Sequence, residues 1–155
     1  MKSFALQDTL SGWKLYIDGA ARGNPGKAGV GIYLLDKQGK PCVQKGLFIG
    51  TKTNNQAEYL ALLIGLMYAR SYVPPTDNLI IFSDSQLLVR QIKGIYRVKN
   101  AGLLPIYEKA RHTLKDFTWD IHHVPREFNK IADALANEGV DMLTPIPKEM
   151  QSVLP

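Results

Sequence analysis

Four acidic residues lie where the pattern of the chain changes, namely Asp18, Glu58, Asp84 and Asp133. Asp18 and Asp84 each follow a short apolar run, whereas Glu58 and Asp133 lie near the starts of segments with helical spacing. A single acid in such a place is typical of a solvated or helix-capping side chain. Carboxylates that converge instead repel one another and favour a hard cation such as Mg²⁺ or Mn²⁺ between them. The chemistry that such a set supports is metal-assisted phosphoryl transfer.

The stretch that carries Asp18 has the pattern of a strand that runs into a turn. Apolar and polar residues alternate over residues 13–18, and glycines and a proline interrupt residues 19–26. We therefore expect the strand to end at Asp18 and a glycine-rich turn, in which the backbone can approach a ligand closely, to follow it. A plain hairpin turn with a solvated Asp18 is the alternative.

The order of the remaining elements predicts an α/β fold. Three strands come first, and their short links favour an antiparallel meander. A helix then leads to a continuous apolar run, typical of a buried strand, and a right-handed crossover places this strand parallel to the first. Asp18 and Asp84 then lie at the same edge of the sheet, where open α/β folds have their sites. The predicted strands are 13–18, 30–36, 41–49, 79–82 and 118–124, and the predicted helices follow residues 53–55, cover 85–93 and 103–117, and follow the capping residue Asn129.

Length and composition are those of a single globular domain. The chain has 155 residues, of which 45% are hydrophobic and 21% charged, so a disordered or fibrous protein is not indicated. A net charge of +5 suits a polyanionic partner. The single cysteine, Cys42, excludes an intrachain disulfide and a cysteine-based zinc site. The apolar runs are too short to span a membrane and the first residues lack the apolar core of a signal peptide, which predicts a cytoplasmic protein.

Four sequence blocks, each with one of the acids, resemble those of the type 1 ribonucleases H. They are residues 18–26 (DGAARGNPG), 53–59 (TNNQAEY), 83–85 (SDS) and 129–136 (NKIADALA). One block alone is weak evidence, whereas four blocks in the family's order, each with its acid, are specific. The resemblance covers residues 13–140, which would be the catalytic domain, with a leader at 1–12 and a C-terminal tail at 141–155.

The resemblance implies a ribonuclease H-like fold, with a mixed sheet of three antiparallel and two parallel strands flanked by helices. It implies an endonuclease that hydrolyses the RNA strand of RNA/DNA hybrids with two Mg²⁺ ions, or Mn²⁺, and leaves 5′-phosphate and 3′-hydroxyl ends. Asp18 would be the ligand shared by both ions, Glu58 and Asp84 would complete the first site, and Asp133 would hold the second ion. The enzyme would act as a monomer, with no membrane partner.

The same resemblance implies contacts with the substrate. Three asparagines match positions beside the 2′-hydroxyl groups of the RNA, and an amide can both donate and accept a hydrogen bond. Two polar residues match positions that hold a DNA phosphate, and an aromatic residue lies near one of them in the basic loop, residues 96–102. The asparagines also have the ordinary properties of turn and cap residues. The three asparagines are Asn24, Asn54 and Asn55, the two phosphate-contacting residues are Thr53 and Asn100, and the aromatic residue is Tyr96.

The chain departs from the best-known members of the family in two places. It has no long Lys- and Trp-rich insertion before Leu103, so it resembles the protrusion-less archaeal and bacterial members, and we expect weaker hybrid binding. It also lacks the histidine that many members carry on a loop before the last acid. We predict that Arg126, seven residues before Asp133, takes the place of this histidine as a catalytic residue. His122 and His123 fall on the predicted last strand, and His123 is the alternative accessory residue.

Two other classes of function remain open at this stage. A nuclease of the same superfamily that acts on DNA, such as a resolvase or a transposase core, would share the acids, but the Thr-Asn-Asn block beside Glu58 argues against it. A non-catalytic hybrid-binding module would not require all four acids.

Overall fold

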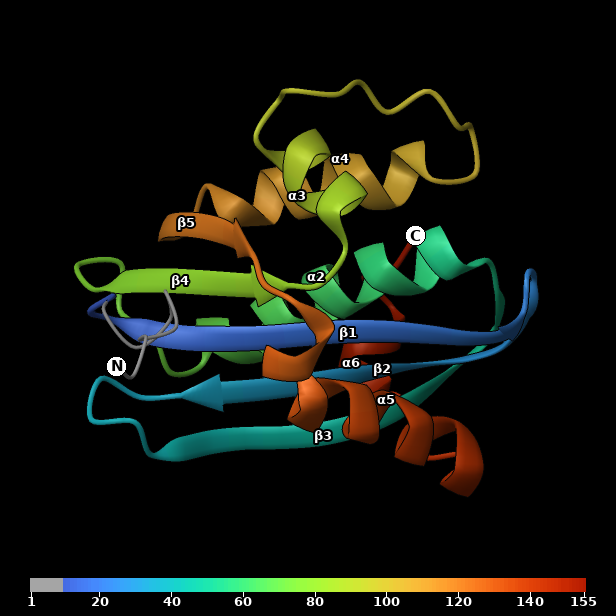
Figure 1. The fold of residues 1–155 in the computed structure, drawn as a ribbon, viewed down its shortest axis with the longest axis horizontal. Coiled ribbons are helices and arrows are strands. Elements are labelled where there is room, and N and C mark those ends of the chain that lie inside the picture. Colours follow the sequence, from blue (N-terminus) through green and yellow to red (C-terminus); the bar gives the residue numbers. More distant parts are fainter. Residues whose placement is uncertain (1–9) are drawn as a thin grey trace.

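The protein, described by a computed structural model over residues 10–155, is built on one five-stranded sheet with the order β3-β2-β1-β4-β5 (Figure 1). β1 pairs antiparallel with β2, which pairs antiparallel with β3. On its other side β1 pairs parallel with β4, which pairs parallel with β5. The predicted mixed sheet is therefore confirmed. The strands are β1 (Trp13–Gly23), β2 (Gly26–Leu35), β3 (Pro41–Lys52), β4 (Asn78–Ser83) and β5 (Thr118–His123).

The main helices cover opposite faces of the sheet (Figure 1). On one face, Gly65 of α2 lies against the side chains of Leu15, Ile17 and Ile32. On the other face, α5 crosses β2 and β3. α4 packs on α2, and α3 contacts β4 and β5. The helices are α2 (Asn54–Arg70), α3 (Gln86–Ile92), α4 (Leu104–Leu114), α5 (Lys130–Met142) and the short α6 (Lys148–Gln151), with a 3₁₀ turn η1 (Arg126–Phe128) before α5.

The start of α2 is fixed by a capping box. The Thr53 hydroxyl accepts a hydrogen bond from the Gln56 backbone N–H, and the Gln56 side chain accepts one from the Thr53 N–H. After this start, α2 is buried on most of its sides, which is why it carries an apolar residue at almost every position from 59 to 66. The predicted cap and core-facing stripe are both present in the structure.

α5 lies unusually close to the sheet because glycines face it. A Cβ atom on Gly31 of β2 would overlap the carbonyl oxygen of Ala132, and one on Gly46 of β3 would overlap that of Leu135. The two glycines therefore allow backbone-to-backbone contact between the sheet and the helix. Ala132 immediately precedes Asp133, so this contact also determines the depth at which the last of the four acids lies.

The expectation that the first strand ends at Asp18 is wrong. β1 continues to Gly23, with Gly19, Ala20 and Ala21 paired to β2, so Asp18 lies inside a strand. Gly19 does not form a turn. A Cβ atom there would overlap the backbone of Ala57, so the glycine allows the first turn of α2 to touch the strand.

The C-terminal segment packs against the sheet. The backbone N–H of Phe48 in β3 donates to the carbonyl of Thr144 at 2.6 Å, and Pro145 forms a bridge with the same residue. Ile146 and Met150 then contact the core. Most of the predicted leader lies outside the described residues, and the division into leader, domain and tail stays a prediction. Within residues 10–155, none of the helices combines the length and the apolar character that crossing a membrane requires.

Candidate active site

Three of the four acids meet beside the middle of β1. One carboxylate oxygen each from Asp18, Glu58 and Asp84 lie within 4.8 Å of one another. The sheet explains why: the pairing of β1 with β4 ends at Ile17 and Ser83, whereas β1 runs on to Gly23. Asp84, the first residue past β4, is therefore level with Asp18, as predicted for two neighbouring parallel strands.

Glu58 enters the site from the first turns of α2. Its Oε1 accepts a hydrogen bond of 2.6 Å from the backbone N–H of Gly19. β4 has already ended at this level, so the carboxylate takes the place that a strand partner would hold. The contact ties α2 to β1 and aims the Glu58 side chain at the other two acids.

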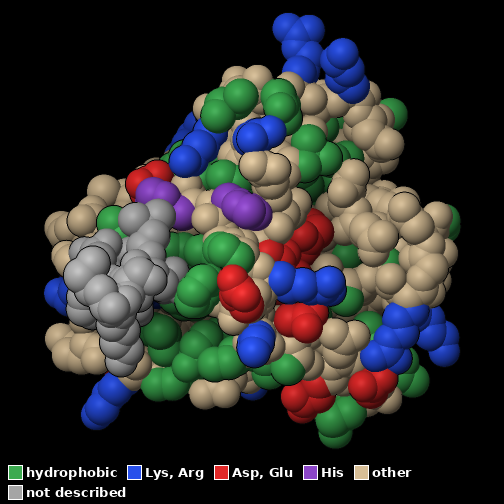
Figure 2. All heavy atoms as spheres, in the orientation of Figure 1, with side chains coloured by type: hydrophobic (Ala, Val, Ile, Leu, Met, Phe, Trp, Pro, Cys, Tyr) green, Lys and Arg blue, Asp and Glu red, His purple; other side chains and the backbone are tan. Residues whose placement is uncertain are grey.

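Asp133 completes the set from the opposite face of the sheet. It lies in the first turn of α5 and lines the same cavity of about 550 Å³ as Asp18, Glu58 and Asp84. The four predicted acids are therefore brought together, three of them in a tight group and Asp133 next to it. In Figure 2, acidic and basic side chains lie side by side over this face of the molecule.

Asn129 is the N-cap residue of α5, as predicted, and also holds the start of the helix to the site. Its side chain does not make the capping hydrogen bond that the prediction implied. Its side chain is buried, and Nδ2 donates to the carbonyl of Ile17 at 2.9 Å. This bond reaches β1 one residue before Asp18, so it fixes the N-terminus of α5 against the strand that carries the first acid.

Burial and mutual repulsion favour protonated carboxyl groups when no cation is present. Burial is the largest cause that raises the pKa of Asp18 to about 10, and the negative charges of Glu58, Asp84 and Asp133 add to it. Burial also raises the pKa of Glu58 to about 7, although the hydrogen bond from Gly19 acts in the opposite direction. A site that disfavours its own negative charge in this way fits a divalent cation, and all its donors are oxygen atoms.

These shifts predict that the metal-free protein loses stability as the pH rises. Asp18 holds its proton in the folded protein up to about pH 10 and in the unfolded chain only to about pH 4, so the stabilisation present at pH 4 declines through that interval. Asp18→Asn removes the effect. Even one pKa unit is about 1.4 kcal/mol, so we expect the variant in EDTA at pH 8 to melt higher than the wild type by roughly 3 °C or more.

Thermal unfolding at pH 5 and pH 8 measures this effect. The difference in melting temperature between wild type and Asp18→Asn should be larger at pH 8. The control is Asp116→Asn, since Asp116 is an exposed acid that pairs with Arg70 at 2.9 Å. A wild type that is as stable at pH 8 as the Asp18→Asn variant would contradict the raised pKa.

A second, polar cavity of about 400 Å³ adjoins the acids and collects five of the six predicted substrate residues. Asn54 and Asn55 line both cavities and so connect them. The Asn24 Oδ1 accepts from the Asn54 N–H at 3.0 Å, and the Asn100 Oδ1 accepts from the Gly102 N–H at 2.8 Å. The lining residues are Asn24, Thr53, Asn54, Asn55, Gln56, Asn100 and Leu103.

Tyr96, the sixth predicted residue, does not line this cavity. Its hydroxyl accepts a hydrogen bond of 2.9 Å from Nη1 of Arg90, and the guanidinium carbon lies 5.3 Å from the centre of its ring. The half-exposed ring therefore belongs to the surface of the basic loop rather than to the polar cavity.

Arg126 lies beside Asp133, as the sequence spacing suggested. Its Nη2 is 4.0 Å from the Asp133 Oδ1, and its side chain is 82% exposed. Its positive charge also lowers the pKa of Glu58 slightly against the effect of burial. His122 and His123 both lie on β5, and neither is among the described residues that line the acidic cavity.

The cavity wall also contains polar residues that were not predicted from the sequence, Ser85 among them. Arg22 and Asn137 both line the acidic cavity. Asn137 follows Asp133 by four residues, a spacing that places both on one face of a helix and that could have drawn attention to it. Arg22 lies within the block of residues 18–26, but the sequence does not indicate in which direction its long side chain points.

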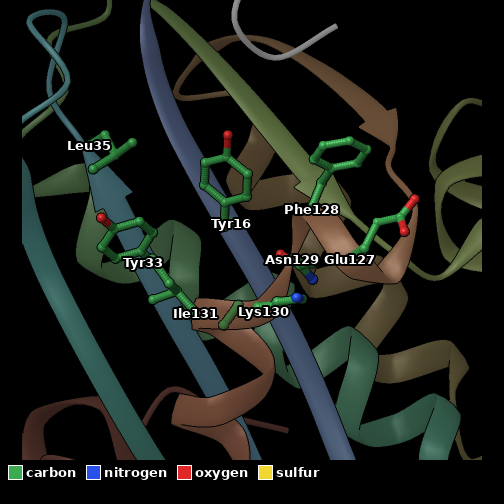
Figure 3. Close-up of a pocket in the computed structure, with 9 residues that line it drawn as sticks. Tyr16, Tyr33, Leu35, Glu127, Phe128, Asn129, Lys130 and Ile131 are labelled. Carbon is green, nitrogen blue, oxygen red and sulfur yellow. The ribbon is translucent and has the colours of Figure 1, made fainter. Parts of the chain in front are cut away.

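An apolar pocket of about 240 Å³ lies apart from the acids (Figure 3). Tyr16 and Tyr33 project from neighbouring strands, and Phe128 and Ile131 approach them from η1 and α5. None of the four acids lines it. The chemistry therefore belongs to the acidic cavity rather than to this one.

Comparisons with known proteins agree with the geometry of the acids. Residues 16–139 match the family described as reverse transcriptase-like. The chain is 43% identical to Ribonuclease HI of Halobacterium salinarum over 81% of its own length and 63% of that protein. It is 35% identical to Ribonuclease H of Coxiella burnetii, over 82% and 88% of the respective lengths. LC11-RNase H1, solved in complex with an RNA/DNA hybrid, superimposes with a TM-score of 0.79 at 36% identity, over 84% of this chain and 97% of that one. The chain spans less than two thirds of the length of the first curated relatives that it matches.

Proposed function

The chain belongs to the ribonuclease H family, and on that premise we propose that it hydrolyses the RNA strand of RNA/DNA hybrids by two-metal-ion catalysis. The products are a 5′-phosphate and a 3′-hydroxyl end. The observation that carries the proposal is the convergence of Asp18, Glu58 and Asp84 within 4.8 Å, with Asp133 in the same cavity. The hybrid bound to LC11-RNase H1 supports the choice of substrate.

The four carboxylates are the residues that would hold two Mg²⁺ ions, with Mn²⁺ as a possible replacement. Asp18 interacts with Glu58 and Asp84 and also with Asp133, which suits a ligand common to both ions. Bound ions would activate the attacking water and stabilise the leaving oxygen. Deep burial of Asp18, which is 5% exposed, keeps its carboxylate in one orientation. The N–H of Gly19 does the same for Glu58.

The asparagines provide the discrimination between RNA and DNA. Asn54 and Asn55 lie between the acids and the polar cavity, so a ribose next to the scissile phosphate would face them. Their amides can donate to and accept from a 2′-hydroxyl, which DNA lacks. The polar cavity, with Thr53, Asn24 and Asn100, would then hold a phosphate of the DNA strand.

Arg126 would act at the exposed mouth of the site. Its guanidinium stays charged at all working pH values and lies beside Asp133, so it can attract the phosphate of the product or orient water there. It cannot exchange protons as a loop histidine does near neutral pH. Tyr96 and the basic loop would contact the hybrid at its periphery, and the enzyme would act as a monomer.

A cleavage assay on matched duplexes tests the proposal. The wild-type protein with Mg²⁺ should cut the RNA strand of a hybrid, and leave duplex DNA and duplex RNA of the same sequence intact. EDTA should abolish the reaction, and the ends can be identified by their susceptibility to phosphatase and polymerase. Cleavage of the DNA duplex would support a resolvase-type or transposase-type nuclease instead. Binding of the hybrid without cleavage would support a non-catalytic module.

A further inference from the structure

Asn137 contacts Asp133 and has no role in the chemistry proposed above. It lies one helical turn after the acid on α5 and is half-buried. Its Nδ2 donates to the Asp133 carbonyl oxygen at 3.0 Å and lies 3.5 Å from Oδ1 of the Asp133 carboxylate. Helical side chains lean toward the N-terminus of their helix, so the Asn137 amide is directed back at the acid.

Arg22 determines which way the Asn137 amide is turned. Its Nη2 donates to Oδ1 of Asn137 at 3.5 Å and to the Asn137 carbonyl oxygen at 3.4 Å, while Nη1 lies 2.6 Å from Oδ1 of Asp141. A guanidinium has only donors and an ionised carboxylate only acceptors. The amide oxygen of Asn137 must therefore face Arg22, which leaves the amide nitrogen for Asp133.

Asp133 needs such a tether more than Asp18 does. Asp18 is almost fully buried, whereas the side chain of Asp133 is 35% exposed and comes from a different face of the sheet. Asn137 at 3.5 Å and Arg126 at 4.0 Å both approach Oδ1 of Asp133 rather than Oδ2, and the Asp18 carboxyl group also interacts with the Asp133 side chain. Contacts on one oxygen define how the plane of the carboxylate is turned. Arg126 is largely exposed, so Asn137 is the more constrained of the two.

We propose that Asn137, held by Arg22, is a positioning residue that turns the Asp133 carboxylate toward the second divalent ion. The inference rests on the proposed function, and Asn137 itself touches neither substrate nor ion. Partners that orient metal ligands typically change metal affinity or activity by about 10–100-fold when they are removed. The pair links the end of β1, which also carries Asp18, to the helix that carries the last acid.

Two substitutions of Asn137 separate orientation of the acid from simple tethering of the helix. Asn137→Ala removes the side-chain contacts with Asp133 and with Arg22, and keeps only the contact of Arg22 with the backbone carbonyl oxygen of residue 137. Asn137→Asp keeps an acceptor for Arg22 but replaces the donor that faces Asp133. We expect both variants to lower kcat on the hybrid about tenfold, with KM changed less than about twofold, and to need more Mg²⁺ for half-maximal rate. Glu138→Ala, an exposed neighbour on the same helix, is the matched control and should behave as wild type.

A binding measurement gives a readout that does not depend on turnover. Calorimetric titration with Mn²⁺ should show weaker binding in both Asn137 variants than in the wild type, while the metal-free melting temperatures stay within about 3 °C of each other. Arg22→Ala should have an effect in the same direction. In the Asn137→Ala background it should add little, because Arg22 acts through the amide.

The outcomes distinguish this inference from the proposed function. Wild-type protein that does not cleave the hybrid refutes the proposed function, and the Mn²⁺ titration still tests the contact. If the wild type is active and Asn137→Ala has the same kcat and Mn²⁺ affinity, the inference is overturned. A fully active Asn137→Asp variant overturns it as well, since the tether to Arg22 alone would then suffice.

Discussion

Replacing Asp18 with asparagine is expected to lower the rate of RNA-strand cleavage by at least about a thousandfold, or about 4 kcal/mol of barrier. Asp18 interacts with all three of the other acids, two of which lie with it in the tight group of carboxylates. An amide of the same shape has no negative charge with which to hold two cations. Steady-state cleavage of a hybrid at saturating Mg²⁺ measures the loss.

Loss of metal binding should accompany the loss of cleavage by Asp18→Asn. If Mg²⁺ binds the folded carboxylates, as proposed, and not the unfolded chain, it should raise the melting temperature of the wild type and leave that of the variant nearly unchanged. Asp116→Asn makes the same chemical change at an exposed ion pair and should keep both responses. Near-wild-type turnover by Asp18→Asn would refute the two-metal proposal.

Gly31→Ala is expected to destabilise the protein and to reduce its activity together. The new methyl group would overlap the carbonyl oxygen of Ala132, a backbone atom that can move only if the start of α5 moves. Overpacking of this kind costs roughly 3 kcal/mol, which lowers the melting temperature by about 6–12 °C. Asp133 follows Ala132 directly, so kcat should fall in the protein that remains folded.

Gly65→Ala is the matched control for this substitution. Gly65 lies in α2 on the other face of the sheet, and its new methyl group would meet the Ile17 side chain at 3.1 Å rather than a backbone atom. A side chain can adjust by a few tenths of an ångström, and alanine favours a helix over glycine by up to about 1 kcal/mol. If Gly31→Ala were as stable and as active as Gly65→Ala, the close contact of α5 with the sheet would not position the last acid.

The sequence predicted the order of the elements and the convergence of the acids because both depend on local patterns. Apolar periodicity identifies strands and helices, and the right-handed crossover then places Asp84 beside Asp18. Gly19 was misassigned to a turn because its purpose is visible only in three dimensions: it faces Ala57, a residue far along the chain. A glycine in a sequence shows that a side chain is absent, but not which backbone segment occupies the space.

Polar side chains with long-range partners were the other limit of prediction. Asn129 has the local features of a cap, yet its amide reaches Ile17 in β1. Arg22 and Asn137 meet across 115 residues of sequence. Tyr96 has a local partner, Arg90, six residues before it, and lies outside the polar cavity. These choices depend on which partner the folded chain presents, and a single sequence contains no periodicity that would reveal it.

The difference in length between β1 and β4 also bears on how the protein avoids self-association. Past Ile17, β1 has a strand neighbour only on the β2 side, so its other side is an open edge to which a strand of another molecule could pair. Here Glu58 takes the N–H of Gly19, and the side chains of Asp18 and Asp84 lie beside it. The side chains that serve the chemistry therefore also occupy the edge of β1 at which pairing with a strand of another molecule would begin.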